Sequence, residues 1–334
     1  MTTDTPPPLL TPTTPCISNP LAERANAIRE QVAKAFIGQD DVLDLVMVAL
    51  LAGGHVLLEG VPGLGKTLLV RALSQALGCS HARVQFTPDL MPSDISGHAV
   101  FDPKLERFEV RKGPVFTHLL LADEINRAPA KTQSALLEAM QEQQVTIEGH
   151  SFPLPPPFMC LATQNPLELE GTYPLPEAQL DRFLLKVLIG YPSLEDEKRM
   201  VAAVSEGKMA AEFDLSQIAQ VLHGDEVLAL QQATATVRVD ATVLDYAVRI
   251  AAATRNWPGI ALGAGPRGSI ALVRAARAQA LLSGRDFVTP DDVRTIAKPA
   301  LRHRIALAPE LHIEGQSADA VLHALLAKVD APRQ

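Results

Sequence analysis

The segment from Gly60 to Thr67 constrains the fold of this chain more than any other part of its sequence. It follows a short apolar run, His55 to Leu58, and opens a helical segment, Lys66 to Leu77. Glycines at this spacing let backbone N–H groups turn inward around an anion, and the helix N-terminus adds a positive dipole. The strand–turn–helix context favours a phosphate-binding loop over a Gly-rich turn without a ligand. The segment therefore predicts a nucleoside-triphosphate site in a layered α/β domain.

Further apolar runs predict the sheet of that domain. A strand is expected around Ala82 to Phe86, and Thr117 to Ala122 and Phe158 to Thr163 are continuous apolar runs. Such runs are typical of parallel strands that are buried on both faces. Helical segments lie between them, notably Ala130 to Gln141, and two more helices precede the first strand. We predict an α/β domain over residues 21–191, with a parallel sheet and helices on both faces.

The pattern changes after Tyr191-Pro192, where strand signals stop and Ala-rich helical periodicity begins. We therefore place a domain boundary near residue 191 and predict an all-α lid domain over residues 192–334. One of its helices has a clear start, with Thr289 as N-cap and Pro290 at the first position. The expected helices are Leu194 to Val204, Ser216 to Thr234, Ala241 to Thr254, Gly268 to Leu282, Pro290 to Arg304 and Asp319 to Val329.

The N-terminal segment and the overall charge bound the partners of the chain. Residues 1–20 are rich in Thr and Pro and predict a disordered tail, with a recruitment peptide as the alternative. The formal net charge of −8 disfavours nucleic acid as the principal partner, because proteins that grip phosphate backbones usually carry a basic face. The three cysteines lack metal-like spacing, and we find no signal peptide and no membrane span. We expect a cytoplasmic protein.

Four side chains are candidates for handling the triphosphate and its metal ion. Lys66 is expected to neutralise β- and γ-phosphate oxygens, and the Thr67 hydroxyl to ligate Mg²⁺. An apolar strand delivers Asp123 and Glu124 at its carboxyl end. Asp123 is expected in the Mg²⁺ shell, and Glu124 is expected to orient or deprotonate the attacking water. An acid pair of this kind is also common on protein surfaces, but here it follows a phosphate loop.

Three further polar residues have a functional and an ordinary interpretation. Asn165 follows the strand ending near Thr163; its amide suits the attacking water or the γ-phosphate, and equally an Asx-type turn before Pro166. Arg182 suits the charge of a transferring phosphoryl group, also from another subunit, or a surface pair with Asp181. Arg267 opens a lid helix, where it either reaches a nucleotide between the two domains or is a solvated charge.

Two segments are predicted as insertions into the α/β unit. Thr87 to Gly113 contains alternating apolar residues in a hairpin-like pattern. Gln144 to Pro157 contains two alternating stretches around the turn residues Glu148 and Gly149. They are either inert decorations or the places where a ring ATPase touches its client.

Taken together, these segments resemble the MoxR family of AAA+ ATPases, part of the larger group that includes magnesium chelatase motor subunits and minichromosome maintenance helicases. The resemblance covers about Ile37 to Pro192, and more loosely the chain through Arg304. One departure is visible, since Ser96 stands where many relatives have Thr. The most specific segments are Leu58 to Thr67, Phe86 to Gly97, Leu121 to Ala128 and Gly171 to Phe183.

The resemblance implies roles for individual residues. Asn165 matches the sensor-1 amide, Arg182 the arginine finger acting in trans on a neighbouring subunit's ATP, and Arg267 the sensor-2 arginine. Residues 87–113 match the helix-2 insert and residues 144–157 the hairpin before sensor 1. The implied ligands of Mg²⁺ are Thr67 and Asp123. The implied nucleotide contacts are Ile37, Gly38, Gly60, Val61, Pro62, Gly63, Leu64, Gly65, Lys66, Thr67 and Leu68.

The resemblance also implies an activity and partners. No motif residue is missing, so an active ATPase that converts ATP to ADP and phosphate with Mg²⁺ is expected. Family members are similar in forming hexameric rings and in working with a partner that bears a von Willebrand factor A domain. Many are chaperones that remodel a client enzyme or insert its metal cofactor. The alternatives are a nucleotide-switched scaffold for such a partner and, less favoured by charge, a nucleic-acid motor.

Overall fold

The fold was determined as a computed structural model, which describes residues 19–104, 106–166, 171–205 and 215–332. Of the predicted N-terminal tail, only Asn19 and Pro20 are within the described residues. Two helices precede the sheet, α1 (Pro20–Ala33) and α2 (Asp40–Leu51). Asn19 caps α1 by accepting a hydrogen bond from the Leu21 amide at 3.1 Å.

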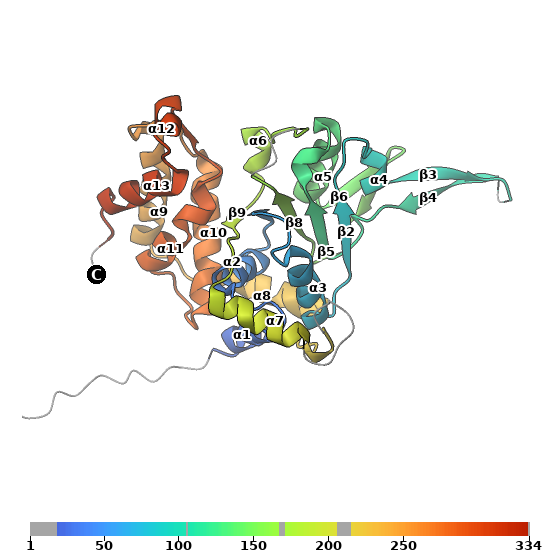
Figure 1. The fold of residues 1–334 in the computed structure, drawn as a ribbon, viewed down its shortest axis with the longest axis horizontal. Coiled ribbons are helices and arrows are strands. Elements are labelled where there is room, and N and C mark those ends of the chain that lie inside the picture. The colour runs from blue at the N-terminus through green and yellow to red at the C-terminus, as the bar shows by residue number, and fades with distance from the viewer. Residues whose placement is uncertain (1–18, 105, 167–170, 206–214, 333–334) are drawn as a thin grey trace, which may run out of the picture.

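The centre of the molecule is a five-stranded sheet with the order β2-β5-β8-β1-β9 (Figure 1). Each neighbouring pair is parallel, so all five carboxyl ends lie along one edge. The predicted strands are confirmed to within about two residues. The strands are β1 (Val56–Glu59), β2 (His81–Gln85), β5 (Leu119–Asp123), β8 (Met159–Gln164) and β9 (Leu185–Leu188).

Strand β9 was not predicted from the sequence. It lies at the edge of the sheet, beside β1. Its charged residue, Lys186, forms an ion pair with Glu59 on β1 at 2.7 Å, which compensates the charge inside an otherwise apolar strand. The strand therefore ends the sheet next to the loop that follows β1.

Alternate residues of the strands face two separate hydrophobic cores. Leu58 and Leu121 pack with α2 and with α3 (Lys66–Ala76) on one face. Leu57 and Leu120 pack with α5 (Ala130–Glu142) on the other. The predicted sheet with helices on both faces is confirmed. The short helices of this domain are α4 (Pro92–Ser96), the 3₁₀ turn Ile125–Arg127 and α6 (Glu177–Leu180).

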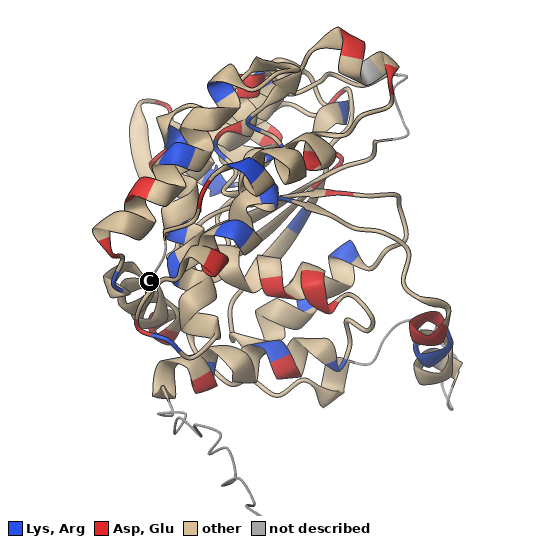
Figure 2. Ribbon diagram, turned by 90° about the vertical axis from the view of Figure 1, so that its left-hand side faces the viewer, with Lys and Arg blue, Asp and Glu red and all other residues tan. Residues whose placement is uncertain are grey.

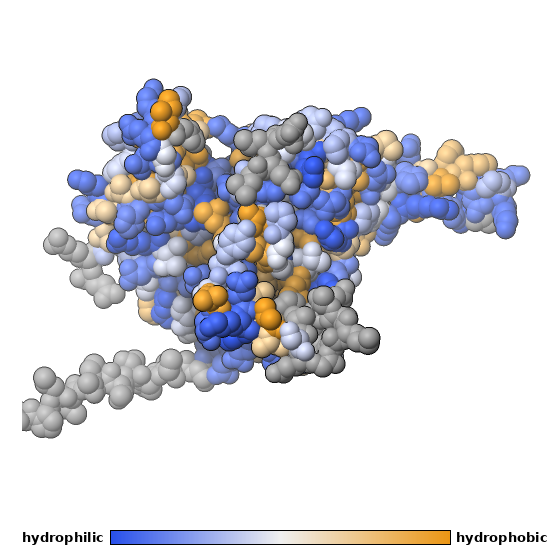
Figure 3. All heavy atoms as spheres, in the orientation of Figure 1, coloured by the Kyte–Doolittle hydropathy of each residue, from blue (hydrophilic) through white to orange (hydrophobic). Residues whose placement is uncertain are grey.

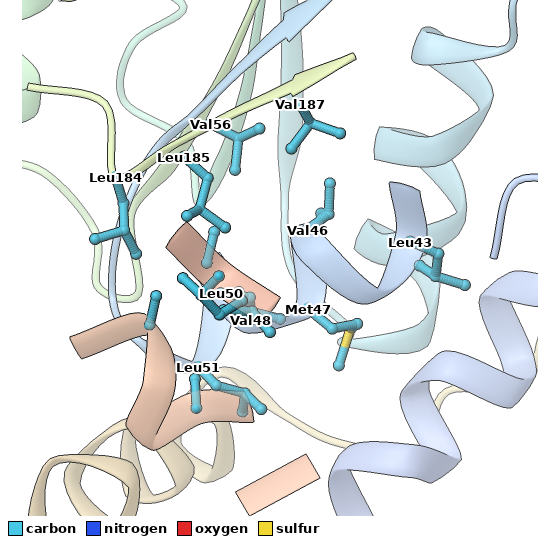
Figure 4. Packing of buried hydrophobic residues seen from close by; sticks show 14 of the residues in the cluster. Leu43, Val46, Met47, Val48, Leu50, Leu51, Val56, Leu184, Leu185 and Val187 are labelled. Carbon is cyan, nitrogen blue, oxygen red and sulfur yellow. The ribbon is translucent and has the colours of Figure 1, made fainter. Parts of the chain in front are cut away.

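Helix α2 joins the sheet to the lid. Its residues from Val46 to Leu51 are all buried, because one side packs on the sheet and the other on the lid helices (Figure 4). A helix that is apolar around most of its circumference is typical of an element enclosed by protein. The core of this face of the sheet is thus continuous with the core of the lid.

Each of the two predicted insertions contains a hairpin, and their bounds stay predictions. The first, β3 (Gly97–Asp102) with β4 (Arg107–Lys112), projects far from the body of the domain (Figure 1). The second pairs β6 (Gln144–Ile147) with β7 (His150–Pro153) across a turn in which Glu148 and Gly149 have positive φ. The β6 strand contacts both β3 and α4, so the two insertions lie side by side.

The lid is helical, as predicted, and also holds one short antiparallel pair, β10 (Ile260–Leu262) with β11 (Ala306–Leu307). The helices after residue 191 are α7 (Leu194–Ser205), α8 (Gly224–Thr236), α9 (Ala241–Ala253), α10 (Pro266–Leu282), α11 (Pro290–Leu301), α12 (Pro309–Ile313) and α13 (Ala318–Lys328), with 3₁₀ turns at Leu215–Gln217 and Thr254–Asn256. The division of the chain at residue 191 stays a prediction.

The prediction of a single helix over Ser216 to Thr234 is wrong. The backbone before Gly224 bonds to the end of α3 instead of forming helical hydrogen bonds. The Val221 amide donates to Ala76 O at 2.9 Å, and Gln75 Nε2 donates to Ile218 O at 2.9 Å. Helix α8 starts only after His223, whose amide donates to the Glu226 carboxylate at 2.8 Å.

Helix α11 begins as predicted, with Thr289 as N-cap and Pro290 at its first position. A capping box joins Thr289 to Asp292, and Arg285 binds both carboxylate oxygens of the buried Asp292, at 2.6 and 2.7 Å. The arginine and the capping bonds lower the pKa of Asp292 despite its burial. A hydrogen-bonded charge pair therefore anchors the start of this helix.

Charge is mixed over the surface of the fold. Lys and Arg are interspersed with Asp and Glu on the elements seen in Figure 2. Within the described ranges, no helix combines the length and apolar character needed to cross a bilayer.

We predict that Leu50→Ala in α2 lowers the free energy of unfolding by about 2–5 kcal/mol, because it leaves a cavity where sheet and lid share a core. Leu50 is 1% exposed. Urea denaturation measures the effect. Leu244→Ala, on the surface of α9 with Leu244 48% exposed, is the control and is expected to change stability by less than about 0.5 kcal/mol. Equal losses in the two variants would contradict the described packing.

Candidate functional site

The loop between β1 and α3 has the backbone shape that its glycines predict. Gly63 and Gly65 adopt φ values of +85° and +77°, which side-chain-bearing residues rarely adopt. Gly60 is needed for a different reason, since a Cβ there would lie 2.5 Å from the carbonyl oxygen of Ile189 after β9. The loop therefore fits closely against the end of β9 while its glycines turn it around an open space.

Lys66 and Thr67 open helix α3 beneath this loop. The Lys66 ammonium donates a hydrogen bond to Gly60 O at 2.5 Å, so it lies across the mouth of the loop. Burial lowers the pKa of Lys66, although Asp123, Glu124 and Glu59 each act to raise it. The ammonium is thus partly desolvated, which strengthens its attraction for an anion such as phosphate.

Asp123 and Glu124 stand at the carboxyl end of β5, facing the same space. Asp123 accepts a hydrogen bond from Thr163 Oγ1 at 2.6 Å and pairs with Arg83 at 2.6 Å. Glu124 has a φ of +56°, and its amide donates to Thr163 Oγ1 at 2.8 Å. Its carboxylate accepts from Gln85 Nε2 at 2.8 Å. The strained backbone of Glu124 and these hydrogen bonds fix the orientation of its side chain.

Asn165 follows β8 and is buried, at 7% exposed. It lines one cleft with the phosphate loop and with the two acids, and the volume of the cleft is about 390 Å³. All these groups come from the carboxyl ends of β1, β5 and β8, where open α/β sheets bind their ligands. The cleft is lined by Gly60, Pro62, Gly63, Gly65, Lys66, Thr67, Leu68, Arg71, Arg83, Gln85, Asp123, Glu124, Thr163 and Asn165.

The donor groups in this cleft fit a magnesium ion that is bound together with a triphosphate. Thr67 and Asp123 supply oxygen atoms, which Mg²⁺ prefers. Among the residues that the structure covers, no cluster of three or more His, Cys, Asp or Glu side chains forms a closed metal cage. Mg²⁺ usually takes only one or two carboxylates and completes its shell with water and phosphate, so an open site is the expected form.

An apolar cavity of about 440 Å³ adjoins the phosphate loop and shares Pro62 and Gly63 with the cleft. Tyr191, Met200 and Val201 line it from the end of the sheet and from α7. Its position and character suit a planar base. Gly38 lines the next cavity along, with Gln39 and Tyr191, whereas Ile37 lines neither of the two.

Sequence reasoning missed several residues around the cleft. Arg83 and Gln85 lie on β2, two residues apart and therefore on the same face, opposite Leu121 and Asp123 in the register of the sheet. The alternate positions of Arg83 and Gln85 were visible in the predicted strand. Placing them beside Asp123 required the pairing of β2 with β5. Tyr191, at the predicted domain boundary, is another such residue, since it lines the apolar cavity beside the phosphate loop.

Arg182 and Arg267 are not in this cleft. They line a second cavity, of about 400 Å³, together with residues that precede β1 (Gly54 and His55) and β9 (Leu184). The strands are parallel, so this cavity lies at the amino edge of the sheet and the phosphate loop at the carboxyl edge. The five residue steps from His55 to Gly60 correspond to about 16 Å of strand. The structure therefore places Arg267 away from the phosphate loop of its own chain. This differs from the interpretation in which Arg267 reaches a nucleotide between the two domains.

The alternative of an Arg182–Asp181 surface pair is also wrong. Asp181 pairs with Arg304 at 2.7 Å and with Arg267 at 3.7 Å. Among the described residues we find no hydrogen bond or ion pair of the Arg182 side chain, and its buried Nε lacks a partner. The side chain of Arg267 is 57% exposed. Four arginines thus line one cavity, Arg182, Arg267, Arg274 and Arg304, and Arg182 has no charged partner among the described residues.

Comparison with known proteins agrees with this geometry. Residues 55–185 match the ATPase family associated with various cellular activities (AAA), and residues 252–325 match the AAA lid domain. The chaperone MoxR1 of Mycobacterium tuberculosis is 44% identical, over 91% of this chain and 81% of that protein. The protein MoxR of Methylorubrum extorquens is 33% identical, over 93% and 96%.

Two further relatives cover nearly the whole chain. YeaC of Bacillus subtilis, a protein of uncharacterised function, is 46% identical over 91% of this chain and 94% of its own length. The crystal structure of a candidate ATPase from Cytophaga hutchinsonii superimposes with a TM-score of 0.86 at 40% identity, covering 94% of this chain and 96% of that one. With its phosphate loop, its acid pair and its helical lid, the chain belongs to the MoxR family of AAA+ ATPases.

Proposed function

We propose that this chain hydrolyses ATP, with Mg²⁺, in a ring of identical subunits, and uses the energy to remodel a client protein. One observation carries the proposal. The phosphate loop, the acid pair and Asn165 line a cleft at the carboxyl edge of the sheet, and Arg182 and Arg267 line a separate cavity at the amino edge. A head-to-tail contact between protomers brings such complementary edges together, and repeated contacts of this kind form a ring when the rotation between protomers closes.

Within one protomer, each group of the cleft has a distinct task. The loop amides and Lys66 hold the β- and γ-phosphates, and the apolar cavity beside Tyr191 takes the adenine. Thr67 and Asp123 would hold Mg²⁺, which would neutralise charge on the phosphate oxygens. Residues that line the cleft but carry no such task, including Leu68, complete its wall.

Hydrolysis requires an oriented water and a place for its proton. Glu124 takes the proton as the water oxygen bonds to the γ-phosphorus, and the bond from that phosphorus to the bridging oxygen breaks to leave ADP and phosphate. Gln85 donates a hydrogen bond to the Glu124 carboxylate, and the Glu124 amide donates one to Thr163 Oγ1. These bonds fix the orientation of Glu124. Asn165 positions the water or the γ-phosphate from the next strand.

The neighbouring protomer completes the site. We infer that Arg182 acts in trans as the arginine finger and that Arg267 enters the same neighbouring cleft. An unpaired guanidinium suits this task, because it loses no internal ion pair when it meets the charge developing on the phosphoryl group. A hexamer is the ring size that the family resemblance implies.

The remodelling role is inferred from the relatives, one of which is named a chaperone. The projecting β3–β4 hairpin offers a contact for a client, since it carries exposed apolar surface (Figure 3). Phe101 and Phe108 are directly opposite each other across the two strands, are 50% and 72% exposed, and pack edge to face at 5.4 Å. Insertion of a metal cofactor into the client, and a partner with a von Willebrand factor A domain, are part of the same proposal.

We predict that Glu124→Gln lowers the ATPase kcat by at least about 10²-fold while Mg·ATP still binds, because the amide keeps the shape of the acid but does not take a proton. Lys66→Ala is the matched variant and should lose binding itself. Phosphate release measures turnover, and a fluorescent ATP analogue measures affinity. Unchanged turnover in Glu124→Gln would contradict the assignment of the cleft.

We also predict that Arg182→Ala lowers kcat by about 10³-fold or more, with ATP affinity and assembly nearly unchanged. Each variant lacks a different half of the shared site, so mixed rings formed by co-expressing Arg182→Ala and Glu124→Gln chains should regain turnover. An intact finger from a Glu124→Gln protomer then meets the intact cleft of an Arg182→Ala protomer. If the mixed rings stay as inactive as their parents, Arg182 does not act in trans.

A further inference from the structure

Arg304, which follows α11 in the lid, is among the most completely bonded side chains of the described structure. Its side chain is 4% exposed, so its charge is almost fully removed from water. A buried guanidinium is costly unless its donors are satisfied. Burial lowers the pKa of Arg304, and Asp181 raises it. The side chain therefore occupies this position only because particular acceptors surround it.

Those acceptors belong almost entirely to one segment, Asp181 to Leu184. Nε donates to Asp181 Oδ1 at 2.7 Å, and Nη1 donates to Leu184 O at 3.1 Å. Nη2 donates to Asp181 O at 3.1 Å and to Phe183 O at 2.7 Å. The fifth donor bonds to Ala300 O, in the last turn of α11. All five N–H groups of the guanidinium are thus used, four of them on the segment before β9.

That segment carries Arg182, the residue proposed above as the arginine finger. Arg304 holds the carboxylate and the carbonyl of the residue before it and the carbonyl of the residue after it. The same carboxylate, that of Asp181, also lies 3.7 Å from Arg267. The backbone on both sides of Arg182 and the acidic partner of Arg267 are therefore fixed by a single side chain of the lid.

Two neighbours of Arg304 strengthen this attachment. Nε2 of the buried His303 lies 3.0 Å from Phe183 O. Arg302 donates to Lys186 O in β9 at 3.3 Å and pairs with Asp319 of α13 at 2.9 Å. Three consecutive lid residues thus bind consecutive parts of the segment that leads through Arg182 into the sheet.

We propose that Arg304 is a positioning residue, which acts through Asp181 and the Asp181–Leu184 backbone to present Arg182 and Arg267 as one rigid pair to the adjacent protomer. The inference rests on the function proposed above, since it needs the arginines to act in trans. It goes further by making the direction of the finger depend on the lid: a movement of α11 moves Arg182 with it. A lysine cannot replace this group, because one ammonium has three donors and no planar fork.

The test uses the full chain with Arg304→Lys and, as a second variant, Asp181→Asn. We expect kcat to fall about 10²-fold in Arg304→Lys, the usual cost of displacing a catalytic group by about an ångström. ATP affinity at the variant's own cleft should stay within about twofold, since that cleft is at the other edge of the sheet. If Arg304→Lys does not fold, Asp181→Asn decides, because it removes the anchoring carboxylate and leaves the carbonyl acceptors in place.

Mixed rings separate positioning from a structural role. Co-expressed in equal amounts with Glu124→Gln, either variant should recover to about a quarter of the wild-type turnover, because half of the protomers have an intact cleft and half of those receive an intact finger. A variant that damaged its own domain would not be rescued. Arg285→Lys is the matched control, as another arginine bound to a buried aspartate, at the opposite end of α11; its turnover should stay near that of the wild type.

Three outcomes overturn the inference. Wild-type kcat in both Arg304→Lys and Asp181→Asn shows that the segment needs no such anchor. Rescue of Arg182→Ala by Glu124→Gln, without rescue of Arg304→Lys and Asp181→Asn, leaves the shared site intact and rejects the positioning role alone. Failure of all the mixed rings rejects action in trans, and the inference falls with it.

Discussion

The common direction of the five strands is the constraint on which the rest of this structure depends. A parallel sheet gathers the carboxyl ends of distant strands along one edge. The loop after β1, the two acids at the end of β5 and the amide after β8 therefore line one cleft. The same geometry collects the segments before β1 and β9 at the opposite edge, with Arg182 and Arg267. One chain therefore carries the candidate triphosphate cleft and the cavity of Arg182 and Arg267 about one strand length apart, and the proposed head-to-tail assembly rests on this polarity.

The lid contributes to the second half more than to the first. Its core is continuous with one face of the sheet through α2, which is buried between them. Its charged contacts with the sheet are concentrated where α11 ends, on the segment that contains Arg182. On the nucleotide side, the described contribution of residues after 191 is the apolar wall formed by Pro192 and α7. The segment after α11 thus supports the backbone on both sides of Arg182, whereas the cleft beside the phosphate loop is lined by residues that precede residue 191.

Much of the fold and of the cleft could be predicted because the relevant signals are local. The turn after β1, the apolar strands and the cap at Thr289 each depend on a few adjacent residues, and the structure confirms the backbone conformation of all of them. The errors concern interactions between distant segments. Residues 218–222 bond to the end of α3 instead of continuing a helix, and β9 joins the sheet beside β1.

The same distinction applies to the site residues. Asp123 and Glu124 follow directly from their strand, whereas Arg83 and Gln85 required the pairing of β2 with β5. The sequence placed Arg267 at a helix start but not at an edge of the sheet, because that depends on how the lid packs.

A structure of the assembled protein with Mg²⁺ and a non-hydrolysable ATP analogue tests the central claim most directly. The account predicts the Arg182 guanidinium at hydrogen-bond distance from the γ-phosphate bound to the adjacent chain; Arg182 facing solvent or its own nucleotide would contradict it.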